Sequence, residues 1–278
     1  MENKICLITG CNGGIGKYAA IELAKKNYEI IMLVRDSDKS RVAFEDIKAQ
    51  SKNNDIKMYY ADLSSQESIV NAAKKITKEY SQIDVLINNA GVLKRNREIT
   101  TEGFEMTLAV NYFAPFLLTN LLLPLLEKSP QGRIINVSSE LYKKGKAKIS
   151  KLSTEGEFDG HEAYANSKLL IVIFTKELAR QLRDKNITVN CLHPGVVGTD
   201  IFREYPKWLN ASVNFFISKP AVGAEPIVHL ATSAEVSKIS GQYFYKNKST
   251  PTMGIVNDDN ISEQIWNDSN SITNITNW

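Results

Sequence analysis

The sequence predicts an α/β protein: one doubly wound domain in which helices cover both faces of a mostly parallel sheet of about seven strands. Three observations favour this fold class. Short apolar runs alternate with longer segments of helical period, which is typical of strand–helix–strand units. Most of the runs are continuously apolar, as strands buried on both faces are. A glycine-rich turn follows the first run and opens the first helix, where such sheets bind ligands.

The elements follow from periodicity taken along the chain. Strands are predicted at residues 4–9, 29–34, 56–61, 85–88, 133–138 and 188–192, with a last one at 241–245. Helices are predicted at 15–26, 39–51, 66–80, 104–128 and 163–184, with shorter ones near 226–233 and 262–266. Because each strand–helix–strand unit needs the next strand to cover its helix, residues 1–278 are expected to form a single domain.

Three segments do not follow the alternation. Residues 140–162 read as a long loop that carries five lysines, and residues 199–225 are rich in aromatic side chains. Residues 268–278 are mostly polar, and we expect this end of the chain to fray.

The composition excludes several classes of function. Apolar residues make up 43% and charged residues 23% of the chain, which is the mix of a folded soluble protein. A net charge of +3 gives no basis for nucleic-acid binding. The three cysteines form no C-x-x-C pair, so neither a disulfide framework nor a cysteine-built zinc site is encoded. A reducing compartment, the cytoplasm, is expected.

Neither a metal site nor a membrane-spanning segment is expected. The most apolar stretch, 116–126, is interrupted by Thr119, Asn120 and Pro124 and falls short of the roughly 18 apolar residues of a spanning helix. The histidines are far apart along the chain, at His161, His193 and His229.

The glycine-rich turn is the first candidate site. Its residues are Gly10, Asn12, Gly13, Gly14, Ile15 and Gly16. Glycine permits a tight turn and a close approach of the backbone to a pyrophosphate, whose charge the N-terminus of the following helix meets. The spacing G-x-x-x-G-x-G differs from the commoner G-x-G-x-x-G, but its place between a strand and a helix favours a dinucleotide site.

A tyrosine and a lysine form the second candidate site. Tyr164 and Lys168 are four residues apart in a segment of helical period, so both side chains lie on one helix face. A free tyrosine titrates near pH 10. The ammonium group is expected to lower the pKa of the phenol and thereby make it an acid–base catalyst.

Together these motifs resemble the short-chain dehydrogenase/reductase family. The resemblance rests on the glycine turn, on Asn88-Asn89-Ala90-Gly91 and on Tyr164-Ala165-Asn166-Ser167-Lys168. Segments such as GRIINVSS and VNCLHPGVVGTD are similar to its retinol dehydrogenase and carbonyl reductase branch, and the likeness covers essentially the whole chain. The resemblance implies a Rossmann fold that transfers hydride between a nicotinamide dinucleotide and a carbonyl or alcohol.

The resemblance also implies the catalytic set Asn111, Ser139, Tyr164 and Lys168. Tyr164 would protonate the carbonyl oxygen and Ser139 would hydrogen-bond it, with Ser138 left open as the alternative because adjacent serines on a strand face opposite ways. Lys168 would bind the nicotinamide ribose, and Asn111 would hold a water that links Lys168 to solvent. Tyr164 and Lys168 therefore count as cofactor-binding residues as well.

Further cofactor contacts are implied in the same way. Asp62 and Leu63 would meet the adenine, with Asp62 accepting from its amino group. Asn88, Asn89, Ala90 and Gly91 would line the adenosine side, and Pro194, Gly195, Val197 and Thr199 would hold the nicotinamide.

The residues after the second strand favour NADP over NAD. Asp36 lies at about the distance where an acidic residue binds the ribose hydroxyl of NAD, but Val34 occupies the position where NAD-preferring relatives place their acid. Arg35 follows at once, and Lys17 and Lys39 are expected to converge with it on the 2′-phosphate.

The substrate follows less directly. Residues 199–225 occupy the place of a flexible substrate lid in relatives, and its rings would suit an apolar aldehyde or ketone; equally, they would suit core packing or a subunit contact, so a homo-oligomer stays open. The lysine-bearing loop is either a wall of the substrate entrance or a solvated excursion. A non-catalytic dinucleotide sensor would not need all four catalytic residues, and 278 residues leave no room for the substrate domain of a nucleotide-sugar epimerase.

Overall fold

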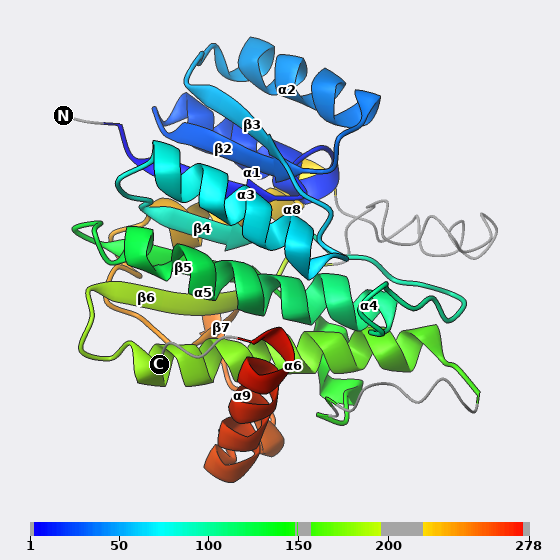
Figure 1. Ribbon diagram of the computed structural model, residues 1–278. Helices are drawn as coiled ribbons and strands as arrows, with labels where there is room; N and C mark the ends of the chain where they lie inside the picture. The colour runs from blue at the N-terminus through cyan, green and yellow to red at the C-terminus, as the bar shows by residue number, and fades with distance from the viewer. Residues whose placement is uncertain (1–2, 148, 150–156, 196–218, 275–278) are drawn as a thin grey trace.

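A single sheet organises the computed structural model, which describes residues 3–147, 149, 157–195 and 219–274 (Figure 1). The strand order is β3-β2-β1-β4-β5-β6-β7-β8, with every pair parallel except β7 and β8. The strands are β1 Ile5–Thr9, β2 Glu29–Val34, β3 Ile56–Tyr60, β4 Val85–Asn88, β5 Gly132–Val137, β6 Ile187–His193, β7 Tyr243–Tyr245 and β8 Lys248–Thr250. The order reverses between β1 and β4, which is the switch point of a doubly wound sheet.

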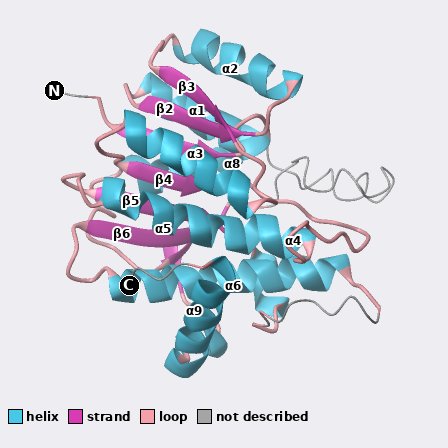
Figure 2. Cartoon of the chain, viewed as in Figure 1, coloured by secondary structure: helices cyan, strands magenta, loops and turns pink. Residues whose placement is uncertain are grey.

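Helices cover both faces of the sheet (Figure 2). Packed on one face are α3 Gln66–Glu79, α4 Met106–Leu108, α5 Ala114–Leu126, α6 Gly160–Gln181 and α9 Asp259–Thr273. Packed on the other are α1 Gly14–Lys25, α2 Asp38–Ser51 and α8 Pro220–Thr232. The expected fold class is confirmed.

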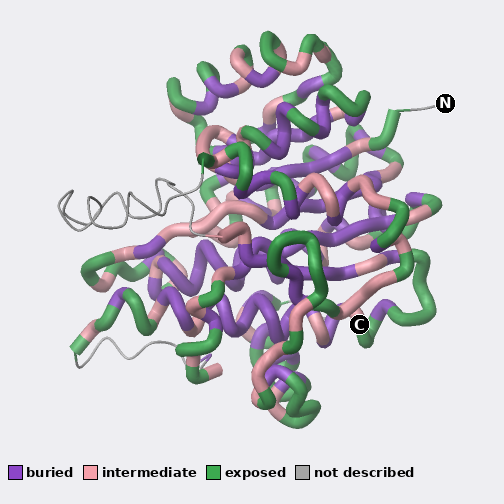
Figure 3. The backbone as a smooth tube through the Cα atoms, turned by 180° about the vertical axis from the view of Figure 1, so that it is seen from behind, coloured by how far each residue is buried: buried purple, intermediate pink, exposed green. Residues whose placement is uncertain are grey.

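Alternation along the strands divides the interior into two cores. Cys6 and Ile8 of β1 face the α1 side, whereas Leu7 between them faces the α5 side, as the two-residue period of a strand requires. Figure 3 shows the buried residues running through the sheet and the exposed ones on outer helix faces and loops.

The predicted strands and helices occur in their predicted order, but several boundaries differ. The sheet has an eighth strand, β8, which pairs with β7 through a two-residue turn with positive φ at Lys246 and Asn247. That pair of left-handed residues forms the tight turn of a hairpin. The strand was missed because its three residues, Lys-Ser-Thr, carry no apolar signal.

The carboxyl-terminal helix corrects the prediction of a fraying tail. Fraying from residue 268 is wrong for 268–273, because α9 runs to Thr273. Ser269 is buried in the interface and bonds the hydroxyl of Tyr112 at 2.7 Å. Polar residues therefore fix this segment through a buried hydrogen bond that helical periodicity does not reveal.

The described parts of the irregular segments include helical residues. The predicted loop 140–162 begins with a short 3-10 helix, Glu140–Lys144, and α6 already begins at Gly160, where Asp159 caps it. Of the predicted lid, 199–225, residues 199–218 lie outside the described residues, and the last part belongs to α8.

One helical stretch, Met106–Leu126, has the length and apolar composition of a membrane-spanning helix, but 72% of its most apolar window is buried inside the protein. It joins α4 to α5 through a single π-helical turn, η1 Ala109–Phe113. Such turns are often found at functional sites, and this one carries Asn111.

Candidate active site

A cleft of about 1200 Å³ lies at the carboxyl ends of the parallel strands. We call it the cofactor cleft. The strand order reverses beside it, the place where open α/β sheets bind ligands. Its walls include most of the residues predicted to bind the cofactor: Gly10, Asn12, Gly13, Gly14, Ile15, Gly16, Arg35, Lys39, Asp62, Leu63, Asn89, Ala90, Gly91, Tyr164, Lys168, Pro194 and Gly195. Val197 and Thr199 lie outside the described residues.

The glycine turn packs tightly against the segment after β4. A Cβ atom on Gly10 would stand 2.9 Å from Ala90, and one on Gly16 would overlap the Asn89 amide. Gly10 also has a φ of +66°, a conformation that side chains other than glycine rarely adopt. The hydroxyl of Thr9 accepts hydrogen bonds from the backbone N–H groups of Asn89 and Ala90, at 2.9 and 3.0 Å. The two loops therefore form one wall.

The N-terminus of α1 fits a pyrophosphate. No side chain caps it, and its first turn holds no acidic residue. Gly13 through Gly16 all line the cleft, so the uncapped N–H groups and the positive end of the helix dipole are available to an anion.

The adenosine end of the cleft places Arg35 and Lys39 on its wall together with Ser37. Asp36 also lines it, but its carboxylate accepts a 2.5 Å bond from the guanidinium of Arg41. The guanidinium of Arg41 therefore offsets the charge of the acid that could have bound a ribose hydroxyl, in an ion pair whose side chains are both largely exposed.

The expected position of Lys17 is wrong. Its ammonium forms an ion pair with Asp46 of α2 and lies outside the cleft walls. The hydrogen bond from Lys17 lowers the pKa of the Asp46 carboxyl. Lys17 therefore links two helices, and of the three cations expected to converge, Arg35 and Lys39 alone line the cleft.

Asn88 is also placed differently from the prediction. It is buried, and its amide nitrogen donates to Thr119 at 3.0 Å and to Asn136 at 2.8 Å. It therefore ties β4 to β5 and α5 below the cleft, whereas Asn89 lines the cleft. Asp62 does line it, with one carboxylate oxygen already accepting from the backbone and hydroxyl of Ser64.

The two serines after β5 interact with different partners. Ser138 is 2% exposed and donates to the backbone oxygen of Lys168 at 3.0 Å, so it ties β5 to α6. Hydrogen bonding to Ser139 lowers the pKa of the Tyr164 phenol. Both serines line the cleft, and Ser139 is the one that interacts with the tyrosine.

Tyr164 and Lys168 lie side by side on the buried face of α6. The ammonium nitrogen is 5.5 Å from the centre of the tyrosine ring and donates to the backbone oxygen of Val137 at 2.9 Å. A Cβ on Gly91 would stand 3.5 Å from this nitrogen and 3.3 Å from the side-chain oxygen of Asn111. The lysine and the asparagine thus converge on Gly91.

Asn111 stands behind the cleft wall. Its amide donates to the oxygen of Val92 and to Ser167, and its oxygen accepts from the N–H of Val92. These bonds fix the segment after β4 to α6. Asn111 is 1% exposed, so its side chain contacts neighbouring protein groups and does not line the cleft.

Burial controls the acid–base state of the pair. Desolvation raises the pKa of Tyr164 to about 12, although the hydrogen bond with Ser139 opposes the rise. Desolvation also lowers the pKa of Lys168 to about 8. The expectation that Lys168 lowers the pKa of the phenol is therefore not met in this structure: removal from water dominates, and the Lys168 ammonium is not among the groups that shift the pKa of Tyr164.

Comparison with known proteins decides the family. The family model for short chain dehydrogenases matches residues 4–210. The chain belongs to the short-chain dehydrogenase/reductase family. The expected membership is confirmed.

Individual relatives agree with this assignment. The chain is 36% identical to mouse retinol dehydrogenase 13, over 97% of its own length and 83% of that protein. It is also 36% identical to mouse retinol dehydrogenase 14, over 96% and 84%. Among solved structures, a Mycobacterium paratuberculosis protein aligns with a TM-score of 0.78 at 26% identity, over 98% of this chain and 93% of that one. The Pseudomonas aeruginosa RhlG/NADP active-site complex aligns with a TM-score of 0.71 at 25% identity, over 88% and 94%.

This short-chain dehydrogenase has cleft residues that sequence reasoning did not single out. Five of them are apolar: Val92, Leu93, Met106, Val110 and Leu141. Charged and polar residues complete the set: Lys94, Glu98, Glu140, Lys143, Lys144 and His193. Val110 precedes the predicted Asn111, and Lys143 and Lys144 belong to the loop 140–162 that the sequence offers as a wall of the substrate entrance. The other residues carried no motif.

Proposed function

We propose that this short-chain dehydrogenase is an NADP(H)-dependent oxidoreductase that interconverts an apolar aldehyde or ketone and its alcohol, with Tyr164 as the proton donor and acceptor. The observation that carries the proposal is the grouping of Tyr164, Ser139 and Lys168 beside an uncapped glycine turn in one cleft. A site that only sensed a dinucleotide would not require a buried tyrosine bonded to a serine.

Each residue of the site has its own role in the proposed reaction. Tyr164, with a pKa raised to about 12 by burial, keeps its proton at neutral pH and gives it to the carbonyl oxygen during reduction. Ser139 shares a hydrogen bond with that hydroxyl and orients the carbonyl. Lys168 and Asn111 hold the backbone around Gly91 and Val137. The bound nicotinamide supplies or accepts the hydride.

Charge at the adenosine end favours the phosphorylated cofactor. Arg35 and Lys39 line that end, and Asp36 is occupied by Arg41. Charge-assisted hydrogen bonds from these cations to a 2′-phosphate are worth more than contacts with an uncharged hydroxyl. The similar RhlG structure is a complex with NADP, which supports the same choice.

The apolar side chains in the wall of the cofactor cleft favour an apolar substrate. Val92, Leu93, Met106, Val110 and Leu141 offer hydrocarbon surface rather than hydrogen-bond donors, which suits a hydrophobic carbonyl compound. The relatives named as retinol dehydrogenases support this class.

The three cysteines are buried and free, in keeping with the proposal of a cytoplasmic, reducing environment.

The test is a panel of aldehydes and ketones with NADPH, and of the matching alcohols with NADP, followed by the absorbance of the cofactor. We expect turnover to be greater with long apolar carbonyl compounds than with sugars or small acids. Tight NADPH binding without turnover across the whole panel would instead favour the sensor.

A further inference from the structure

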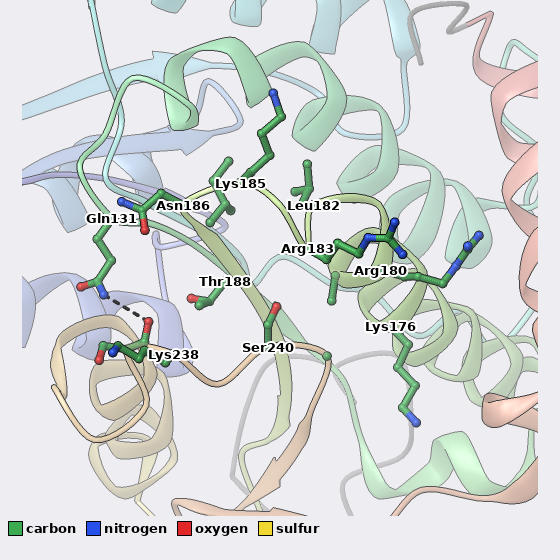
Figure 4. A pocket seen from close by; sticks show the side chains of 14 residues that line it. Gln131, Lys176, Arg180, Leu182, Arg183, Lys185, Asn186, Thr188, Lys238 and Ser240 are labelled. Carbon is green, nitrogen blue, oxygen red and sulfur yellow. Dashed lines mark hydrogen bonds between the residues drawn. The ribbon is translucent and has the colours of Figure 1, made fainter.

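A second hollow lies at the opposite end of the sheet from the cofactor cleft. Figure 4 shows it from close by. Its volume is about 540 Å³, within the range of small-molecule sites. It is lined by the end of α6, the start of β6 and the segment before β7. Ile187, the first residue of β6, belongs to its wall, whereas Tyr164 lies at the carboxyl ends of the strands. We call it the basic hollow, and it is separate from the site described above.

The lining of the basic hollow is positively charged. Among the described residues, the lining contains no aspartate or glutamate but five basic residues: Lys176, Arg180, Arg183, Lys185 and Lys238. The whole chain has a net charge of only +3, from 34 basic and 31 acidic residues. Such a local excess raises the concentration of anions at the surface.

Part of this charge remains uncompensated. Arg180 is held by Glu177 through two hydrogen bonds of 2.9 and 2.7 Å. Arg183 meets Asp184 in a single contact of 3.3 Å, with both side chains largely exposed, and such pairs contribute little. Lys238 has no hydrogen bond or ion pair with any residue in the described ranges.

Lys185 and Lys176 are also only weakly paired. Lys185 forms an exposed ion pair with Glu127 at 3.0 Å. Lys176 donates to the side-chain oxygen of Asn257, an uncharged acceptor. Ion pairs therefore hold three of the five cations, with carboxylates that lie outside the lining. Asp259 and Glu263 also act on Arg180. Lys176 and Lys238 have no carboxylate partner among the described residues.

The middle of the hollow offers hydroxyl groups. Figure 4 shows Thr188 and Ser240 near the centre, with the basic side chains extending around them. The oxygen of Ser240 accepts from the N–H of Val189 at 3.0 Å, so its own hydrogen can be donated to a ligand. Gly241 completes the wall, and a Cβ there would stand 3.3 Å from Ala179.

Hydroxyls surrounded by exposed cations match the oxygens of a phosphate group, because both donor types bind them through charge-assisted bonds. We propose that the basic hollow binds a phosphate-bearing anion, with Lys238 and Arg183 meeting its charge and Thr188 and Ser240 donating to its oxygens. The phosphate of a soluble metabolite and that of a phospholipid headgroup share this chemistry, and the experiment distinguishes the two.

The test titrates inorganic pyrophosphate into the full chain and follows backbone amide shifts by NMR. We expect saturable shifts at Thr188 and Gly241, independent of those at the glycine turn of the cofactor cleft. Lys238→Glu is expected to weaken binding at the hollow about tenfold. Lys74→Glu, which makes the same charge change on the exposed face of α3, is the matched control and should leave binding unchanged.

Two results would overturn the proposal: no saturable shift at Thr188 and Gly241, or equal weakening by Lys238→Glu and Lys74→Glu, which would show general screening. Sedimentation with phosphatidylglycerol–phosphatidylcholine vesicles then identifies the source. Vesicle binding that Lys238→Glu abolishes assigns the hollow to a headgroup. Pyrophosphate binding without vesicle binding assigns it to a soluble phosphate compound.

Discussion

At the scale of single residues, burial sets the protonation of the central pair in the cofactor cleft. Tyr164 is 6% and Lys168 3% exposed, and removal from water favours the neutral form of each. The pKa of the tyrosine therefore rises and that of the lysine falls. The phenol keeps its proton at neutral pH, which suits an acid in carbonyl reduction.

The lowered pKa of Lys168 predicts a pH dependence of stability. The pKa is about 8 in the folded protein, against 10.5 for a lysine side chain in water, so the unfolded chain binds more protons between these values. The free energy of unfolding should therefore rise with pH across this window. Between pH 8 and 10.5, the free energy of unfolding of the wild type should rise by on the order of 3 kcal/mol relative to that of Lys168→Met. Urea unfolding at a series of pH values measures this difference.

Lys74→Met, on the exposed face of α3, is the control for this comparison. Parallel pH profiles of the wild type and Lys168→Met would show that burial does not shift the lysine.

Cofactor choice is also a single-residue prediction. Arg35→Asp replaces a cation at the adenosine end with an acid that repels a 2′-phosphate. The ratio of kcat/KM for NADPH over NADH should fall about 10- to 100-fold, since each charge-assisted bond contributes roughly 1.5 to 3 kcal/mol. Lys26→Asp, an exposed cation at the far end of α1, is the control, and an unchanged ratio in Arg35→Asp would refute the assignment to NADP.

At the scale of elements, the helix from Met106 to Leu126 joins the core to the site. Its π-helical turn presents Asn111 to Val92 and Ser167. Its first turn is fixed by Glu105, whose carboxylate accepts from the N–H groups of Thr107 and Leu108, both at 2.8 Å.

This cap predicts a measurable loss of stability. Glu105 is completely buried, so Glu105→Gln removes the charge and one of two acceptors without leaving a cavity. We expect the free energy of unfolding to fall by about 1 to 2 kcal/mol. Glu67→Gln, in the exposed first turn of α3, should have little effect in the same denaturation experiment. Equal losses in the two variants would mean that the cap contributes nothing specific.

Element order and type follow from the sequence because long periodic segments carry strong signals. The polar strand β8 does not, since its three residues pair along an edge and bury no apolar face. The extent of α9 depends on the buried contact between Ser269 and Tyr112, which joins residues far apart in the chain.

The candidate site was predictable where motifs carry it and not where packing decides. The glycine turn, Tyr164 and Lys168 follow from their spacing. The diversion of Lys17 to Asp46 depends on how α2 packs against α1, and the position of Asn88 below the cleft depends on the register of β4 and β5. The pKa of Tyr164 depends on burial, which spacing does not show.

At the scale of the whole molecule, α9 closes the core beside α5 and α6. Trp266 is 5% exposed and packs against Phe116 and Phe174, with ring centres 5.3 and 6.2 Å away. The carboxyl-terminal helix is thus part of the core, on the face of the sheet that also carries the Tyr164 helix.

Removal of this ring should destabilise the whole domain. Trp266→Ala is expected to lower the free energy of unfolding by about 3 to 5 kcal/mol because it leaves a large cavity, with Trp266→Phe losing less. Thermal and urea unfolding provide the measurement. A loss below about 1 kcal/mol, the usual effect of an exposed position, would show that α9 is not part of the cooperative core.

The most direct test of the central claim compares turnover and cofactor binding in Tyr164→Phe. The substitution removes one hydroxyl and keeps the ring, so NADPH binding measured by fluorescence should be nearly unchanged. Carbonyl reduction should fall by about 10² to 10⁴-fold, the usual contribution of a positioned proton donor. Tyr18→Phe, on an exposed part of α1, should retain both properties. Turnover by Tyr164→Phe at the wild-type rate would contradict the assignment of Tyr164 as the proton donor.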